Sequence, residues 1–177
     1  MEEIKDKKIG SIVLEGSDQS GKTTFAAKLA KWMSEILGRE IKTMHFVKSD
    51  YYEQVQYYTT PLLKEGPFVI DRNYVSELVY GPLFRGKSAI DESAKAAIEK
   101  AYSDANAFVV LLKRENYKWE DRDEMYTKDD NIKVIKAFDD IYDSLNIDKM
   151  KVDAFNEDSL RMVIHHWMNK NNLNTNV

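Results

Sequence analysis

The amino-acid sequence predicts an α/β domain in which a mostly parallel, doubly wound sheet carries helices on both faces. Short apolar runs alternate along the chain with segments whose apolar residues recur at helical spacing. A glycine-rich motif lies between the first apolar run and the first helical segment. The most apolar run, residues 107–112, is typical of a strand buried on both faces. Together these features predict a sheet of five strands with the 107–112 strand in a central position.

The first predicted strand, residues 11–14, is rich in β-branched residues and ends directly before the glycine-rich motif. Beyond the motif, apolar residues from Phe25 to Leu37 follow a helical period, and Gly38 is a good helix stop. The tyrosine-rich segment 51–63 is interpreted as a helix, whose tyrosines either line a substrate cleft or pack in the core or a homodimer interface. The other predicted elements are strands at 41–47, 68–70 and 149–155, and helices at 90–101, 129–145 and 160–168.

Three segments carry signals about where elements begin and end. Residues 88–91 have the spacing of a capping box, so we expect the helix through Ile90 and Ile98 to open there. Residues 113–128 are highly charged and lack an apolar period, which predicts a loop or lid. The Asn-rich end of the chain, from Asn169, is expected to fray.

Composition limits the classes of protein that the chain can belong to. Its 177 residues are 43% hydrophobic, which suits one domain with a sizeable core. A net charge of −4 without a long basic run disfavours a nucleic-acid polymer as partner, whereas a small anionic ligand is compatible. The absence of cysteine excludes disulfides and thiolate metal sites and fits a reducing compartment. Without an apolar signal segment or a run of about 18 apolar residues, a soluble cytoplasmic protein with no membrane contact is expected.

The glycine-rich motif, residues 16–23, matches G-x-x-x-x-G-K-[ST] at every fixed position. Gly16 and Gly21 allow backbone conformations that point successive N–H groups into one concavity, and the following helix adds its positive N-terminal end. Lys22 can follow the charge of the outer phosphates, and the Thr23 hydroxyl can ligate Mg²⁺. The motif therefore predicts a polyphosphate-binding loop. Its candidate nucleotide-binding residues are Gly16, Ser17, Gln19, Ser20, Gly21, Lys22, Thr23 and Thr24.

A second polar pair, Asp71 and Arg72, directly follows the predicted strand at 68–70. Polar residues just beyond a buried strand of an open α/β sheet lie where ligands bind. Asp71 is a candidate to hold Mg²⁺ through water, with a turn cap as the alternative. Arg72 is suited to bidentate recognition of an anion or a base.

Residues 16–24 and 71–86 together resemble the thymidylate kinase family, whose second motif is D-R-[YH]-x-x-S-x-x-A-Y-Q-G-x-x-R-G. The matching positions are Asp71, Arg72, Ser76, Tyr80, Arg85 and Gly86. Residues 122–124 and 142–145 are more loosely similar to the family's lid and the helix after it. Asn73 and Gly81 depart from the motif, and no counterpart is found for an arginine that the family uses near the acceptor phosphate. The compact form is similar to bacteriophage-encoded relatives, some of which act on altered pyrimidine nucleotides.

The resemblance implies a three-layer P-loop kinase fold, with residues 1–177 as one domain and a lid at about 113–128. It also implies ATP and Mg²⁺ as cofactors, and a pyrimidine deoxynucleoside monophosphate (dTMP, dUMP or a modified dUMP) as acceptor. By the same resemblance Asp18 contacts the sugar 3′-hydroxyl, Arg72 the base or phosphate, Ser76 and Tyr80 the base, and Arg85 the phosphate. The alternatives are a loop cap for Asp18, a core position for Tyr80 and a surface position for Arg85.

Members of the resembled family supply a catalytic arginine either from the phosphate loop, just after the aspartate, or from the lid. The loop position here is Gln19, which carries no charge, so a lid arginine is expected to act. Arg122, helped by Lys118, is the candidate, with a surface ion pair as its alternative. Arg114 lies just past the fourth strand, where it can pack against the adenine of ATP.

The sequence is also compatible with functions other than a monophosphate kinase. A deoxynucleoside kinase differs only in the acceptor, and a modified pyrimidine, including one in DNA, is a further substrate class. A nucleotide-dependent switch is disfavoured because the chain's Asn-Lys pair, Asn169-Lys170, is not followed by the aspartate of N-K-x-D. The adjacent His165 and His166 cannot share one helix face, which argues against a metal site there.

Overall fold

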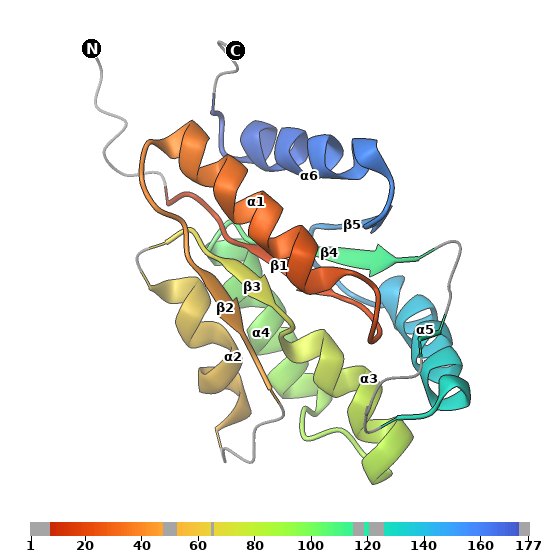
Figure 1. Cartoon of the computed structure of the whole chain (residues 1–177). Coiled ribbons are helices and arrows are strands. Elements are labelled where there is room, and N and C mark those ends of the chain that lie inside the picture. Colours follow the sequence, from red (N-terminus) through yellow and green to blue (C-terminus); the bar gives the residue numbers. More distant parts are fainter. Residues whose placement is uncertain (1–7, 48–52, 65, 115–118, 121–125, 174–177) are drawn as a thin grey trace.

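A computed structural model describes residues 8–47, 53–64, 66–114, 119–120 and 126–173 (Figure 1). Five strands form one sheet in the order β2-β3-β1-β4-β5. Every pairing between neighbouring strands is parallel, so the predicted fold class is confirmed. The strands are β1 (Ile12–Glu15), β2 (Thr43–His45), β3 (Val69–Asp71), β4 (Phe108–Lys113) and β5 (Lys149–Asp153).

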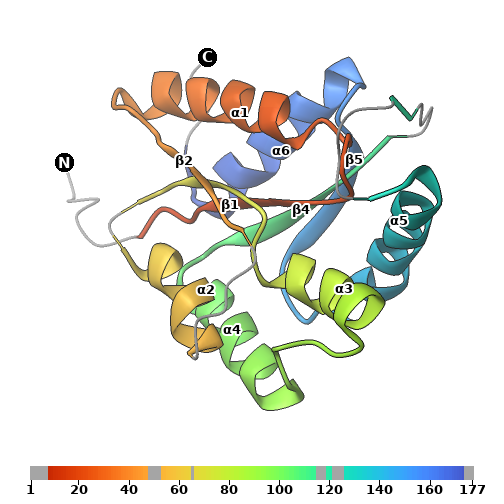
Figure 2. The same ribbon diagram turned by 60° about the horizontal axis from the view of Figure 1, so that its bottom comes forward.

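Helices cover both faces of the sheet and complete three layers (Figure 2). α1 and α6 pack on one face, and the other four helices pack on the opposite face. The helices are α1 (Lys22–Leu37), α2 (Gln54–Leu63), α3 (Tyr74–Arg85), α4 (Glu92–Asp104), α5 (Lys128–Tyr142) and α6 (Glu157–Lys170). No helix in the described ranges is both long and apolar enough to cross a membrane.

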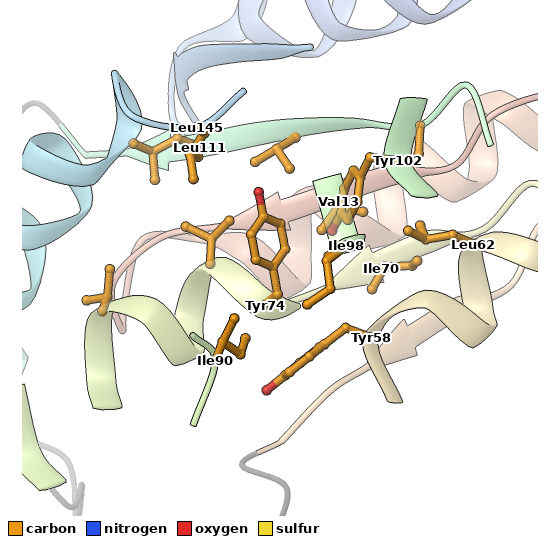
Figure 3. Packing of buried hydrophobic residues seen from close by; sticks show 14 of the residues in the cluster. Val13, Tyr58, Leu62, Ile70, Tyr74, Ile90, Ile98, Tyr102, Leu111 and Leu145 are labelled. Atoms are coloured by element: carbon orange, nitrogen blue, oxygen red, sulfur yellow. The ribbon is translucent and has the colours of Figure 1, made fainter. Parts of the chain in front are cut away.

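The two central strands, β1 and β4, are largely apolar because successive side chains enter two different cores. In β1, Ile12 and Leu14 pack under α1 and α6, whereas Val13 packs with the helices of the other face. Figure 3 shows Val13 in that second cluster with Tyr74 and Ile98. Because β1 and β3 pair in parallel, their carboxyl ends lie side by side, which brings the two predicted motifs together.

The start of α4 corrects the predicted capping box at residues 88–91. The N-cap is Asp91, whose carboxylate accepts a hydrogen bond from the Ala94 N–H at 2.8 Å. Ser88 Oγ instead accepts from the nearer Ile90 N–H at 3.0 Å, which closes a turn before the helix. The helix therefore begins at Glu92, and Ile90 lies outside it.

The predicted loop at 113–128 is shorter at both ends than the charge pattern suggested. Lys113 belongs to β4 and pairs with Asp153, and Lys128 is the first residue of α5. Thr127 and Asp130 form a reciprocal capping box that sets this helix start. Much of the remaining loop, residues 115–118 and 121–125, lies outside the described residues.

The C-terminal segment does not fray at Asn169, because α6 continues to Lys170. Asn171 is buried, and its side-chain oxygen accepts hydrogen bonds from the Gly10 N–H and from Asn106 Nδ2, both at 2.8 Å. This one amide ties the end of α6 to the entry of β1. The prediction that the chain frays from Asn169 is therefore wrong as far as Leu173.

Candidate functional site

The phosphate-binding loop joins β1 to α1 at the carboxyl edge of the sheet (Figure 1). Gly16 and Gly21 adopt φ values of 145° and 85°, which L side chains rarely adopt. A Cβ on Gly16 would lie 2.5 Å from the carbonyl oxygen of Leu112, so β4 also requires glycine there. The backbone geometry that the motif predicts is present.

The Lys22 side chain folds back over this loop and is buried. Its Nζ donates to the carbonyl oxygens of Gly16 at 2.9 Å and Ser17 at 2.5 Å, and to Ser20 Oγ at 3.2 Å. Burial, reinforced by the positive charge of Arg72, lowers the pKa of Lys22 to about 7. A bound polyphosphate would restore the charged form, so the lysine is poised to respond to an anion.

Two oxygen-bearing side chains meet at the start of α1 and the end of β3. Thr23 Oγ1 donates to Asp71 Oδ2 at 3.3 Å, and His45 Nδ1 lies 3.2 Å from the same oxygen. Asp71 Oδ1 is buried and has no hydrogen-bond partner among the described residues. A hydroxyl with an unsatisfied carboxylate fits Mg²⁺, which takes one or two protein oxygens and completes its shell with phosphate and water. The described part of the chain contains no cluster of three or more His, Asp or Glu that could hold a metal alone.

Two cavities adjoin at this edge of the sheet. The first, of about 510 Å³, is lined by the phosphate-binding loop from Asp18 to Thr24 together with Asp71. The second, of about 260 Å³, is lined by aromatic side chains, among them Phe46, Tyr58 and Tyr80, and by polar side chains, most of them from α3 and the residues just before it. Both cavities are lined by Asp18, His45, Arg72 and Tyr126. All five predicted substrate-binding residues line the second cavity, namely Asp18, Arg72, Ser76, Tyr80 and Arg85.

An ion pair between Asp18 and Arg72 marks the boundary between the cavities. Arg72 has a φ of 68°, a left-handed conformation that costs a non-glycine residue about 1 kcal/mol or more. Its guanidinium lies 5.3 Å from the ring centroid of Tyr80. The Tyr80 hydroxyl is buried without a hydrogen-bond partner in the described structure, and burial raises the pKa of Tyr80 to about 12. A strained arginine and an unsatisfied hydroxyl thus face one cavity.

Glu15 is a functional candidate that sequence reasoning missed. Its buried carboxylate accepts from Ser76 Oγ at 2.5 Å and from the Asn73 N–H at 2.8 Å. Burial raises the pKa of Glu15, and these two hydrogen bonds oppose that rise. The carboxylate links β1 to the first turn of α3, so Ser76 is held by Glu15 as well as lining the cavity. An acidic residue at the end of an apolar strand run was the available signal.

Comparison with known proteins places these features in a known fold. The sequence matches no family model and no curated protein. Among solved structures, the YorR protein of Bacillus subtilis in complex with phosphorylated GDP superposes with a TM-score of 0.67 at 20% identity, covering 88% of this chain and 94% of that chain. Thymidylate kinase of Ehrlichia chaffeensis gives 0.52 at 17% identity, covering 91% and 97%. The chain has a P-loop kinase fold. Kti12 of Chaetomium thermophilum in complex with ADP-AlF3 gives 0.55 at 12% identity, covering 90% and 98%.

On the other side of the phosphate-binding loop a third cavity, of about 470 Å³, lies between α1 and the start of α6. Phe155, in the turn after β5, lines it with 59% of the residue exposed. The Arg114 guanidinium lies 4.6 Å from the centroid of this ring. Arg114 was a predicted nucleotide-binding residue, whereas Phe155 was not singled out from the sequence. The two form a shelf beside the loop that can receive a flat base.

The described part of the 113–128 segment contacts the tip of the phosphate-binding loop. The Gln19 amide makes two hydrogen bonds with the backbone of Glu120, donating at 2.8 Å and accepting at 3.0 Å. In the first turn of α5, Asn131 Nδ2 donates to the Asp18 carbonyl oxygen at 3.3 Å. The predicted catalytic Arg122 and its helper Lys118 lie outside the described residues.

Proposed function

We propose that this protein transfers the γ-phosphoryl group of ATP to a pyrimidine deoxynucleoside monophosphate (dTMP, dUMP or a modified dUMP). The products are ADP and the corresponding diphosphate. The observation that carries the proposal is the pair of adjoining cavities, one formed by a phosphate-binding loop and one aromatic, which share Asp18 and Arg72. The shared fold supports it, since the compared structures include a thymidylate kinase and complexes with phosphorylated GDP and ADP-AlF3.

The residues of the phosphate-binding loop are proposed to bind and orient the donor. Phosphoryl transfer depends mainly on positioning and charge neutralisation, so backbone N–H groups and Lys22 suffice where other reactions need a general base. Thr23 and Asp71 would hold Mg²⁺, which supplies charge neutralisation on the phosphate oxygens when bound. The shelf formed by Arg114 and Phe155 is where adenine would pack.

The residues at the junction of the two cavities are proposed to present the acceptor. Asp18 would accept a hydrogen bond from the 3′-hydroxyl of the sugar, while Arg72 would bind the acceptor phosphate. The buried hydroxyl of Tyr80 and the Glu15-anchored Ser76 would contact the nucleoside. Arg122 remains the proposed source of the transition-state cation, in the segment that Gln19 contacts at Glu120.

A coupled assay of ADP release tests the proposal. The acceptor panel contains dTMP, dUMP, modified dUMP, dCMP, dGMP and the matching nucleosides, with acceptor-free ATP hydrolysis as the blank. We expect acceptor-stimulated ADP release with pyrimidine monophosphates above all. Turnover restricted to other acceptors would contradict the proposal, and activity confined to pyrimidines in intact DNA would redirect it to a DNA-base kinase.

A deoxynucleoside kinase is the second candidate, and one observation favours it. Among the described residues, Arg72 is the one arginine that lines both cavities, and it is already paired with Asp18. An acceptor without a phosphate needs no further cation where the two cavities meet. The same panel separates the candidates, because turnover of nucleosides alone would replace the first proposal with the second.

A further inference from the structure

We propose that Arg85, held in place by Glu77, recognises a carbonyl oxygen on the base of the acceptor, and that it does not bind the acceptor phosphate. The inference rests on the proposed function, since it assigns part of the second cavity, of about 260 Å³, which we call the acceptor cavity. It makes Arg85 and Glu77 determinants of base selectivity. It also selects bases with a carbonyl at the pyrimidine 4-position over bases with an amino group there.

Arg85 lies at the end of α3 that is remote from the phosphate-binding loop. Arg72 lies just before Asn73, the N-cap of α3, whereas Arg85 is the last residue of this helix. A helix of 12 residues is about 18 Å long. Arg72 lines both cavities, but Arg85 lines the acceptor cavity and not the cavity of the phosphate-binding loop. Figure 1 shows α3 extending from the end of β3 away from the sheet.

A buried carboxylate fixes the guanidinium in the cavity. Arg85 donates to Glu77 Oε2 at 2.5 Å, and the Ala89 N–H donates to Glu77 Oε1 at 2.9 Å. The Glu77 side chain is 5% exposed and that of Arg85 is 30% exposed. A Cβ at Gly81 would lie 2.8 Å from both Glu77 Oε1 and Ser88 Cα. Glycine at this position therefore leaves room for the ion pair between Glu77 and Arg85. The side chain of Arg85 is therefore held by a built contact and is not a loose surface arginine.

The local charge suits a neutral group better than a phosphate. A phosphate dianion at Arg85 would lie near the buried carboxylate of Glu77, and like charges in a poorly solvated site repel strongly. Arg72 also has a carboxylate partner, Asp18, but there Lys22 and the backbone N–H groups of the loop lie close by. Among the described residues, none that lines the acceptor cavity is a lysine. A base is polar but carries no net charge, so its binding leaves the charges of Arg85 and Glu77 neutralised by each other.

The donor character of Arg85 determines which base it selects. A guanidinium offers five N–H donors and no acceptor. A 4-carbonyl, as in thymine and uracil, accepts a hydrogen bond, whereas the 4-amino group of cytosine presents donors to donors. Aromatic rings of Phe46, Tyr58 and Tyr80 line the same cavity and suit a flat base. The chemistry thus favours a thymine-like or uracil-like acceptor.

Calorimetric titration of thymidine, dTMP and dCMP into the wild type and Arg85→Ala tests the inference. The ratio of the dTMP and thymidine affinities isolates the contribution of the phosphate. We expect Arg85→Ala to weaken thymidine and dTMP by the same factor, roughly ten- to hundredfold for a charged hydrogen bond. The preference for dTMP over dCMP should fall, while Lys87→Ala, an exposed charge change two residues away, leaves every value unchanged.

Glu77→Gln provides a second variant, because it keeps the shape of the side chain that holds Arg85 and removes its negative charge. We expect it to reduce the dTMP preference with the phosphate contribution intact, at an unchanged circular dichroism spectrum. If Arg85→Ala abolished the phosphate contribution and left thymidine binding unchanged, Arg85 would be a phosphate ligand and the inference would be wrong. Unchanged binding of all three compounds would overturn it equally. Failure of the wild type to bind any of them would overturn the proposed function itself.

Discussion

The two halves of the candidate site are built in different ways. The phosphate-binding loop offers backbone N–H groups and one lysine from a single stretch, residues 16–24. The acceptor cavity uses side chains from the loop, the end of β2, α2, α3 and Tyr126. The geometry of the phosphate-binding loop is therefore specified by neighbouring residues, whereas the acceptor cavity forms only when segments distant in the chain pack together. The difference predicts that substitutions in the loop abolish turnover, whereas substitutions in the cavity change which acceptor is used.

The largest effect is expected at Lys22. Lys22→Ala should lower turnover by a factor of order 10³ with the fold preserved, because a charge beside the transferred phosphoryl is lost in a poorly solvated site. Steady-state kinetics with saturating substrates measure it. Lys31→Ala, an exposed lysine on α1, is the matched control. Near-normal turnover of Lys22→Ala would contradict the assignment of the phosphate-binding loop.

The next effect distinguishes two arginines. Arg122→Ala should reduce turnover by up to about 10³-fold if Arg122 supplies the transition-state cation. Arg114→Ala should instead raise the KM for ATP with a smaller change in kcat, since Arg114 lies on the shelf with Phe155. Measuring both constants for each variant separates the roles. A wild-type rate for Arg122→Ala beside a collapsed rate for Arg114→Ala would reverse the assignment.

A smaller effect is expected at Asp18, where the two cavities meet. Asp18→Ala should lower kcat/KM roughly 10²-fold and reduce discrimination between deoxyribose and other sugars, because it leaves both Arg72 and the sugar hydroxyl without their partner. Asp18→Asn keeps the shape and tests the charge alone. The acceptor panel, run with sugar analogues, gives the readout. Unchanged kinetics with every acceptor would return Asp18 to a role as a loop cap.

The smallest effect concerns pH. Because burial lowers the pKa of Lys22 to about 7 from its ordinary 10.5, the unfolded chain binds more protons than the folded chain between these values. The free protein should therefore gain stability as pH rises through this window. Nucleotide binding restores the charged lysine, so affinity should fall above pH 7 by at most about tenfold per unit. Denaturant titrations and calorimetry at pH 7 and 8.5 measure both trends, and neither trend should survive in Lys22→Ala.

Several features of the acceptor side had no local signal. Residues 74–85 form a helix despite Gly81 and Pro82, and no helix was predicted there. Glu77 lies within the motif that resembles thymidylate kinases, yet its carboxylate matters only because Arg85 and Ala89 converge on it. His45 and Tyr126 line both cavities, but neither stands in a motif. His45 and Tyr126 come to these cavities from positions far apart in the chain, whereas the partners of Glu77 lie 8 and 12 positions after it.

The parallel α/β architecture, the phosphate-binding loop and the position of Asp71 and Arg72 at a strand end could all be predicted from the sequence. These follow from periodicity, glycine positions and helix stops, which act over a few residues. Tertiary structure alone decided that Glu15 anchors Ser76, that Asp18 pairs with Arg72, and that a buried amide at Asn171 holds the end of α6. Those contacts join residues 54 to 161 positions apart. A buried polar group must find its partner wherever packing brings one, and no local pattern specifies which residue that is.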